Sequence, residues 1–325
     1  MLSKKTLGFL LKFFIVAFAV FFLFEQLNTK SSVNQLNHDE ILSRIRNNYS
    51  ILLIVVLMML LNWFLESLKW RFLISKVEDI SVLRSIRAIF SGITVSAFTP
   101  NRIGEYGGRV FCLDYADRIQ AVLITVIGSM AQLIITIIFG SIGLIFLPLY
   151  SSEFFKMIEV IDFAYPIMIF LFVLLDILLI IVFLNVSLFS NMLSQISFLH
   201  KYDKYIEVFS FYNTLDLSKV ILYSIARYVV FTTQFFILLT LFNVNVNYFD
   251  AIILIMTMLL VISVIPSIAI TEIGIRGSVA IFLFGLVSSN TSGILSAAFF
   301  MWLINLLLPA LIGTVFIFTL KFFRK

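Results

Sequence analysis

Two short charged segments interrupt an otherwise apolar chain, and both carry the pattern Glu-x-Gly-x-Arg. The first copy comprises Glu105, Gly107 and Arg109, and the second comprises Glu272, Gly274 and Arg276. Each glutamate follows a proline by five or six residues, and the two copies lie about half the chain length apart. This repetition indicates two matching helix breaks that share one polar site.

The arginines of this pattern have two interpretations. An arginine at the centre of a membrane costs roughly 2.5–3.5 kcal/mol on insertion scales, so Arg109 and Arg276 require partners or water. In the functional interpretation they bind an anionic headgroup, because a guanidinium forms paired hydrogen bonds with phosphate. In the structural interpretation each arginine pairs with the glutamate four residues before it on a helix. The duplication favours binding, since a structural ion pair needs no copy at a matching break.

The neighbouring residues supply the rest of the predicted site. Pro100, Gly104 and Pro266 are expected to maintain the helix breaks, where backbone is tolerated only if it faces protein or a water-filled cavity. Free backbone N–H groups at the start of a half-helix favour an anion. The predicted substrate-binding residues are Asn101, Arg102, Glu105, Gly107, Arg109, Glu272, Gly274 and Arg276. The glutamates would orient the arginines or contact a cationic substituent of the headgroup.

Other polar residues stand in apolar surroundings. Asp176 and Arg227 are the sole charges of two consecutive predicted spans and are expected at similar depth. They form either a structural salt bridge or a pair that couples transport to protons or ions. Glu66 is a further cavity candidate, and the sequence Lys-Trp-Arg at residues 69–71 is typical of an anchor at the membrane interface.

The composition identifies the class of protein that positions these residues. Of 325 residues, 61% are hydrophobic and only 13% are charged, and the mean hydropathy is +1.09. Soluble domains carry about 25% charged residues, so we predict an all-α polytopic membrane protein. The single cysteine excludes an internal disulfide, and the two histidines lie in separate polar loops, so no metal site is expected. No nucleophile or nucleotide-binding motif is present, so we expect no catalytic residue, no cofactor and no enzyme activity.

The lengths of the apolar runs predict about six transmembrane helices and two re-entrant or broken segments. The predicted spans are residues 7–24, 51–68, 119–150, 163–186, 219–242 and 293–320. A surface helix is expected at residues 80–87, a re-entrant arm at 88–101 and a turn at 288–292. The run 251–271 is long enough to be a full span, in which case eight crossings result.

The domain organisation follows from the repeat. The chain is expected to be one integral membrane domain, with pseudo-repeat halves at about 51–150 and 219–320 that have inverted topology and place a substrate site near the midplane. The net charge of +5 is informative through its distribution and does not indicate a nucleic-acid partner. Lys and Arg concentrate in loops on one side, which predicts cytoplasmic N- and C-termini in the inner membrane.

Two segments carry a family resemblance. The stretch Phe-Thr-Pro-Asn-Arg-Ile-Gly-Glu at 98–105 and the later Gly-Ile-Arg at 274–276 resemble the hallmark segments of the lysylphosphatidylglycerol synthase transmembrane family, whose members are flippase-like membrane proteins. Family members commonly have glycine where this chain has Asn101, and an acidic residue where it has Gly277. The resemblance implies lipid transport between leaflets, without a soluble synthase domain in this chain.

The expected function is therefore a flippase for a phospholipid or a polyprenyl-linked lipid. Its partners would be the membrane lipid and a separate lipid-modifying or glycosyl-transferring enzyme. Two alternatives remain open, an intramembrane lipid-modifying enzyme that uses a carboxylate as base and a membrane scaffold that transports nothing. The lipid, the energy source, the direction of transport and the oligomeric state stay undetermined at this point.

Overall fold

The computed structural model describes residues 10, 13–14, 38–99, 102–150, 161–188, 190, 203–265, 269–318 and 320. These residues are predominantly helical and include no strand. Five helical stretches are long and apolar enough to cross a membrane, namely Tyr49–Ile74, Arg118–Phe146, Tyr165–Leu184, Thr214–Leu241 and Thr291–Ile317. They coincide with five of the six predicted spans, which confirms an all-α multi-pass membrane fold. The other predicted span, residues 7–24, lies almost entirely outside the described residues.

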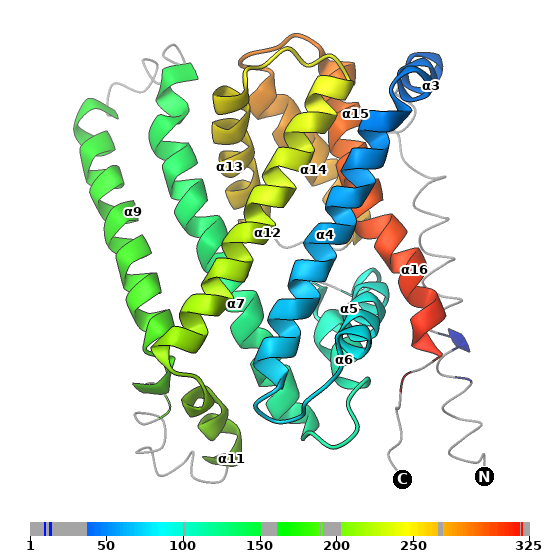
Figure 1. Ribbon diagram of the computed structural model, residues 1–325. Helices are drawn as coiled ribbons and strands as arrows, with labels where there is room; N and C mark the ends of the chain where they lie inside the picture. The colour runs from blue at the N-terminus through cyan, green and yellow to red at the C-terminus, as the bar shows by residue number, and fades with distance from the viewer. Residues whose placement is uncertain are drawn as a thin grey trace. The chain divides into compact units, whose positions relative to one another are not determined.

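The elements follow the chain in the order shown in Figure 1. They are α3 (His38–Asn47), α4 (Tyr49–Ile74), α5 (Val82–Ser96), α6 (Gly104–Val110), α7 (Arg118–Phe146), η2 (Leu147–Tyr150), α9 (Ile161–Leu184), α11 (Asp203–Ile206), η4 (Glu207–Phe211), α12 (Thr214–Leu241), α13 (Tyr248–Val264), α14 (Ala269–Phe284), α15 (Thr291–Trp302), the π-helical turn η5 (Leu303–Leu307) and α16 (Leu308–Ile317).

The chain forms two compact units. The first unit comprises Met1–Gly128, Pro266–Ile275 and Phe299–Lys325, and the second comprises Ser129–Ile265 and Arg276–Ala298. Helices α7, α14 and α15 are each divided between the two units. The first unit therefore contains the glutamates of both charged segments.

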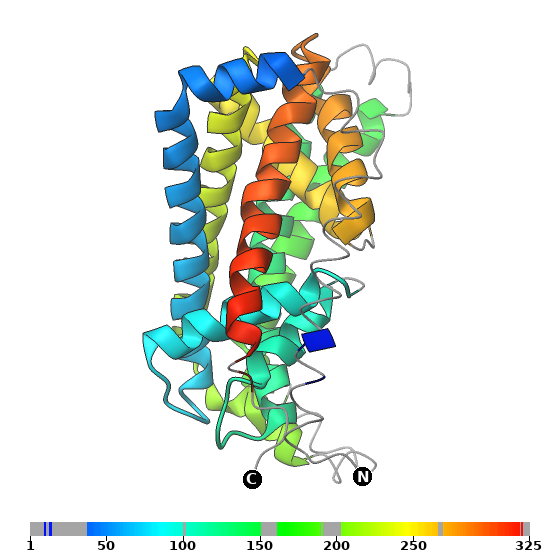
Figure 2. The ribbon, with the colours of Figure 1, turned by 90° about the vertical axis from the view of Figure 1, so that its right-hand side faces the viewer.

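Helix α5 is the centre of packing in the first unit, where it lies against α4, α6 and α16 (Figures 1 and 2). A Cβ atom on Gly313 of α16 would lie 2.1 Å from the carbonyl oxygen of Phe90 and 2.2 Å from the hydroxyl of Thr94. Thr94 also donates a hydrogen bond to the carbonyl of Ala310 at 2.8 Å. Only glycine at position 313 permits this close approach of the two helices.

The region expected to form a surface helix and a separate arm is a single helix, α5. The side chain of Ser81 caps its start by accepting a hydrogen bond from the N–H of Arg84. Ser85 is fully buried and donates to the carbonyl of Ser67 in α4 at 2.6 Å. No proline separates the basic and apolar parts of this stretch, so the helix continues through both and packs its small polar residues inward.

The second unit contains close contacts between apolar helices and a capped turn between α14 and α15. A Cβ atom on Gly140 of α7 would lie 2.4 Å from the Cβ of Leu260 in α13, so these helices also approach closely. Helix α14 ends at Phe284 and α15 begins at Thr291, which confirms the predicted turn. Asn290 caps α15 by accepting a hydrogen bond from the N–H of Gly293 at 2.9 Å. Helix α13 has 17 residues and is shorter than the five candidate spans.

Glu78 fixes the loop after α4 to the segment that precedes α7. Its carboxylate accepts hydrogen bonds from the backbone N–H groups of Asp114, Tyr115 and Ala116 at 2.7–3.0 Å. Arg84 forms ion pairs with both Glu78 and Asp114. Burial acts to raise the pKa of Glu78, but the three backbone hydrogen bonds together hold it below its ordinary value. The ionised carboxylate is therefore the form that stabilises the folded state.

We predict that Glu78→Gln lowers the melting temperature at neutral pH and flattens its dependence on acid. A group whose pKa is lowered by folding stabilises the protein above its unfolded-state pKa, and this contribution is lost as the pH falls through the folded-state pKa. Thermal unfolding in detergent between neutral pH and about pH 3 measures the effect, since an unfolded glutamate titrates near pH 4. Glu207→Gln, at an exposed glutamate, serves as the control. Equal acid sensitivity in wild type and Glu78→Gln would contradict the role of Glu78.

Candidate functional site

The first helix break is the turn between α5 and α6. The two helices pack so closely that a Cβ atom on Gly108 would lie 2.6 Å from the Cα of Gly92. The N–H of Gly104 donates a hydrogen bond to the hydroxyl of Thr99 at 2.9 Å, which holds the start of α6. Gly104 is thus the first residue after the break. The predicted residues Pro100 and Asn101 lie outside the described residues, and Gly107 is half-buried in α6.

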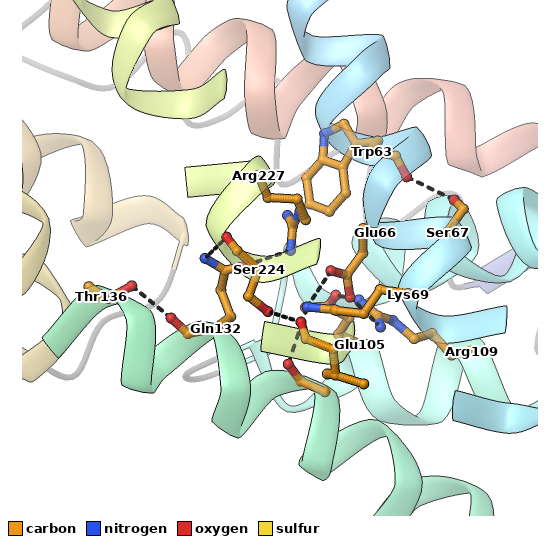
Figure 3. Close-up of polar contacts among 12 residues, drawn as sticks. Trp63, Glu66, Ser67, Lys69, Glu105, Arg109, Gln132, Thr136, Ser224 and Arg227 are labelled. Atoms are coloured by element: carbon orange, nitrogen blue, oxygen red, sulfur yellow. Dashed lines mark hydrogen bonds and ion pairs between the residues drawn. The ribbon is translucent and has the colours of Figure 1, made fainter. Parts of the chain in front are cut away.

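Four charged side chains form a buried cluster beside this break (Figure 3). Glu66 and Lys69 come from α4, whereas Glu105 and Arg109 come from α6. One carboxylate oxygen of Glu66 accepts a hydrogen bond from Nη1 of Arg109 at 2.8 Å, and the other lies 2.8 Å from Nζ of Lys69. Arg109 also pairs through Nη2 with Glu105. Lys69 donates a further hydrogen bond to the carbonyl of Gly128 in α7 at 3.2 Å.

The four charges of this cluster balance, and three of its side chains are shielded from the surroundings, whereas that of Glu105 is 23% exposed. The side chain of Lys69 is 1% exposed and that of Arg109 is 4% exposed. Removing one partner from such a group leaves a buried charge uncompensated, which costs about 3–5 kcal/mol. The pair of Glu105 with Arg109, foreseen in the structural interpretation of the sequence, is formed, and Glu66 adds a second carboxylate to it. In this structure Arg109 binds α6 to α4.

Lys69 and Trp70 do not form the predicted interface anchor. Both residues are 1% exposed, and the indole N–H of Trp70 donates to the hydroxyl of Thr125 at 3.0 Å. The sequence carried a signal for this arrangement, because Glu66 and Lys69 are three residues apart and therefore share one face of α4. This face of α4 is buried in the protein because the carboxylate of Glu66 lies there and requires a cation beside it.

The second helix break lies between α13 and α14. Helix α13 ends at Val264 and α14 begins at Ala269, and the predicted break residue Pro266 lies outside the described residues. Glu272 and Arg276 are 5% and 7% exposed on α14. Gly274 is half-buried between them, inside an uninterrupted helix. The chain is therefore broken before this copy of the charged pattern and continuous within it.

Arg102 connects the two charged segments within the first unit. Its Nη2 atom donates hydrogen bonds to both carboxylate oxygens of Glu272, at 2.8 Å and 2.9 Å. The Glu272 side chain is 7% exposed, whereas that of Arg102 is 41% exposed. Both residues belong to the predicted site, but their direct pairing was not foreseen. The Arg102–Glu272 bridge brings together positions 170 residues apart in sequence.

Asp176 and Arg227 lie in the second unit, and each bonds to α7 rather than to the other. Asp176 accepts a hydrogen bond from the hydroxyl of Ser141 at 3.3 Å. Nη1 of Arg227 donates to the side-chain oxygen of Gln132 at 3.3 Å (Figure 3). The sequence placed these two charges opposite each other by depth alone, and depth does not determine which faces the helices turn toward one another.

An apolar groove lies on the first unit between α4 and α5. Its volume is about 420 Å³, and it is lined by Leu60, Leu61, Phe64, Ile86 and Phe90. The three α4 residues are 41–47% exposed on a helix that is long and apolar enough to cross a membrane. The groove thus lies on an apolar surface of the same unit that holds the charged cluster. No group of three potential metal ligands occurs in the described part of the chain.

The fold and the site define a multi-pass helical membrane protein with buried charges at two helix breaks. The chain belongs to the family described as the lysylphosphatidylglycerol synthase TM region, whose model matches residues 9–313. This match covers nearly the whole chain, and it confirms the family resemblance of the two motif segments. The family is a membrane domain associated with flippase-like handling of lipids. No curated protein and no solved structure gives a match.

We predict that Glu66→Gln destabilises the protein by about 3–5 kcal/mol, because it leaves two buried cations with the single carboxylate of Glu105. The loss is measured as a lower melting temperature of the purified protein in detergent. Adding Lys69→Met to this variant removes one excess cation and should restore part of the stability. Glu207→Gln is the matched control at an exposed carboxylate. A melting temperature of Glu66→Gln equal to that of the control would show that the cluster contributes nothing.

Proposed function

We propose that this protein moves a lipid with an anionic or zwitterionic headgroup between the leaflets of a membrane. The lipid is a phospholipid or a polyprenyl-linked lipid. The observation that carries the proposal is the Arg102–Glu272 bridge, which joins two charged helix breaks in a chain of a family associated with lipid handling. A charged side chain within a transmembrane segment costs free energy, and in membrane proteins such side chains mark substrate pathways.

The arginines of the two breaks hold the headgroup phosphate in this proposal. A guanidinium presents a planar fork of N–H donors that matches phosphate oxygens. Arg109 is bound by Glu66 and Glu105 in the present structure, so it reaches a phosphate only when that ion pairing changes. The glutamates then serve as exchange partners that keep the arginines neutralised while no lipid is bound.

The groove between α4 and α5 provides a place for a hydrocarbon chain. It is lined by five large apolar side chains and belongs to the same unit as the buried charged cluster and the Arg102–Glu272 bridge. A lipid has one polar and one apolar end, and a transporter must accommodate both. A groove of this composition supports transport of a lipid over transport of a soluble anion.

The topology of the proposal follows the sequence repeat. The two broken segments are re-entrant and belong to two halves of inverted topology, so that the site lies near the membrane midplane. The short helix α13 supports this arrangement, because an ordinary span needs about 20 residues. The N- and C-termini are cytoplasmic in the inner membrane, as the distribution of Lys and Arg indicates. A separate lipid-modifying or glycosyl-transferring enzyme would supply the substrate.

The proposed protein is a transporter and not an enzyme. Glu105 and Glu272 are each bound to an arginine, and Glu66 is bound to an arginine and a lysine. In these contacts the carboxylates hold and orient cations. An enzyme with a carboxylate base would instead need one of them poised to take a proton from the lipid.

We predict that the purified protein, reconstituted in liposomes, moves fluorescent phospholipids from the inner to the outer leaflet, where dithionite quenches their fluorescence. Protein-free liposomes lose about half of the fluorescence, because only the outer leaflet is accessible. Wild-type protein should carry the loss well beyond half, and the double variant Arg109→Gln, Arg276→Gln should return it to the protein-free level. Arg46→Gln, at an exposed arginine of α3, is the control.

Each outcome of this assay has a defined meaning. Equal exchange in wild type and in the folded double variant would assign these two arginines to the structure alone. Absence of exchange by the wild type, over a panel of headgroups that includes polyprenyl phosphates, would contradict transport. Size-exclusion chromatography and a melting curve establish that the double variant is folded before it is assayed.

A further inference from the structure

Arg102 has a backbone conformation that arginine seldom adopts. Its φ angle is +58°, in the left-handed region, and the other non-glycine residue with positive φ in the described ranges is Asn243. Asparagine enters this region readily, whereas the Cβ of a long side chain is disfavoured there. Strain of this kind persists where the surroundings determine the conformation, and it concentrates at functional positions.

The turn around Arg102 is held from both sides. The N–H of Arg102 donates to the carbonyl of Thr99 at 3.2 Å, and the N–H of Gly104 donates to the hydroxyl of the same threonine at 2.9 Å. A Cβ atom on Gly104 would lie 2.7 Å from the carbonyl oxygen of Val95, so the chain returns directly against α5. These contacts keep Arg102 left-handed and present its side chain to Glu272.

Only one of the three guanidinium nitrogens of Arg102 donates hydrogen bonds to described residues. Both hydrogen bonds to Glu272 come from the single atom Nη2, and Nε and Nη1 make no hydrogen bond to any described residue. The side chain is 41% exposed. Arg109 differs in both respects, since it is 4% exposed and bonds to two carboxylates through two different nitrogens. The Nε atom of Arg109 makes no hydrogen bond either, but it is buried, so of these two arginines Arg102 is the one with accessible donors.

Resting on the proposed function, we propose that Arg102 makes the first contact with the phosphate of the headgroup, before Arg109 and Arg276 hold it, and that Glu272 is the carboxylate which this phosphate displaces. Nε and Nη1 provide the donors for the first contact. A phosphate beside the guanidinium repels the carboxylate of Glu272 and competes with it for Nη2. Binding of the phosphate therefore weakens the Arg102–Glu272 bridge and releases the link between the two helix breaks.

The proposal makes Glu272 an internal competitor of the ligand. Removing its charge should strengthen phosphate binding, and the gain should depend entirely on Arg102. A bridge with a merely structural role behaves differently, because its loss lowers stability without improving the affinity for any anion. The affinity for a phosphate-bearing lipid is therefore the readout that separates the two roles.

The test measures binding of dioctanoyl phosphatidylglycerol to the purified full chain in detergent by microscale thermophoresis. Glu272→Gln should bind about tenfold more tightly, and Arg102→Gln about tenfold more weakly, as expected for one charged hydrogen bond. The double variant should bind as weakly as Arg102→Gln alone. If Arg102→Gln does not fold, Arg102→Lys replaces it in the test. This variant keeps the positive charge but loses the paired donors of the guanidinium, so it should show an affinity between those of wild type and a variant without the charge. Arg46→Gln and Glu207→Gln are the controls at exposed positions.

The proposal is overturned if Glu272→Gln binds no more tightly than wild type, or if the double variant retains the gain. Inorganic phosphate and dioctanoylglycerol, which lacks phosphate, complete the comparison. Binding of the phospholipid and not of inorganic phosphate identifies a lipid phosphate as the ligand, and equal responses to both identify the phosphate group alone. Binding of dioctanoylglycerol with the same dependence on Arg102 would contradict a phosphate site.

The same variants keep this assignment separate from the proposed transport. A protein that binds the lipid through Arg102 without exchanging it between leaflets contradicts transport and leaves the contact intact. A protein whose lipid exchange is unchanged in Arg102→Gln contradicts the contact and leaves transport intact.

Discussion

The structure of the first unit depends on the need to neutralise charges that lie away from water. A buried carboxylate or ammonium group costs several kcal/mol unless a partner of opposite charge is held in good geometry. Glu66 forms two such ion pairs, one oxygen with Arg109 and the other with Lys69. Because Arg109 belongs to α6 and Lys69 also bonds to Gly128 of α7, three helices are joined through this carboxylate. This ion pairing holds α6, the helix that follows the first break, against α4.

The two glutamates of the repeated pattern are neutralised in different ways. Glu105 pairs with the arginine of its own copy, four residues further along α6, whereas Glu272 pairs with Arg102 of the opposite segment. In each pair one partner is buried and the other is partly exposed, Glu105 to 23% and Arg102 to 41%. The second contact therefore joins the two charged segments, whereas the first lies within one of them.

Membership of the lysylphosphatidylglycerol synthase TM region family connects this arrangement with lipids. The chemistry of the site is consistent with that connection, because it combines guanidinium groups with a groove of large apolar side chains on one unit. The second unit contributes isolated polar contacts, such as that of Arg227 with Gln132. Asp176 likewise accepts a hydrogen bond from an uncharged side chain of α7, that of Ser141.

The sequence by itself determined the class of protein, the five candidate spans that the structure describes and the positions of the two charged breaks. These features follow from composition and from the lengths of apolar runs, which are local properties of the chain. The sequence also indicated the pairing of Glu105 with Arg109, since residues four apart on a helix are neighbours. Only the tertiary structure decided that Lys69 points inward and that Arg102 binds Glu272. The faces that helices turn toward each other depend on packing between segments far apart in sequence, and no local pattern contains that information.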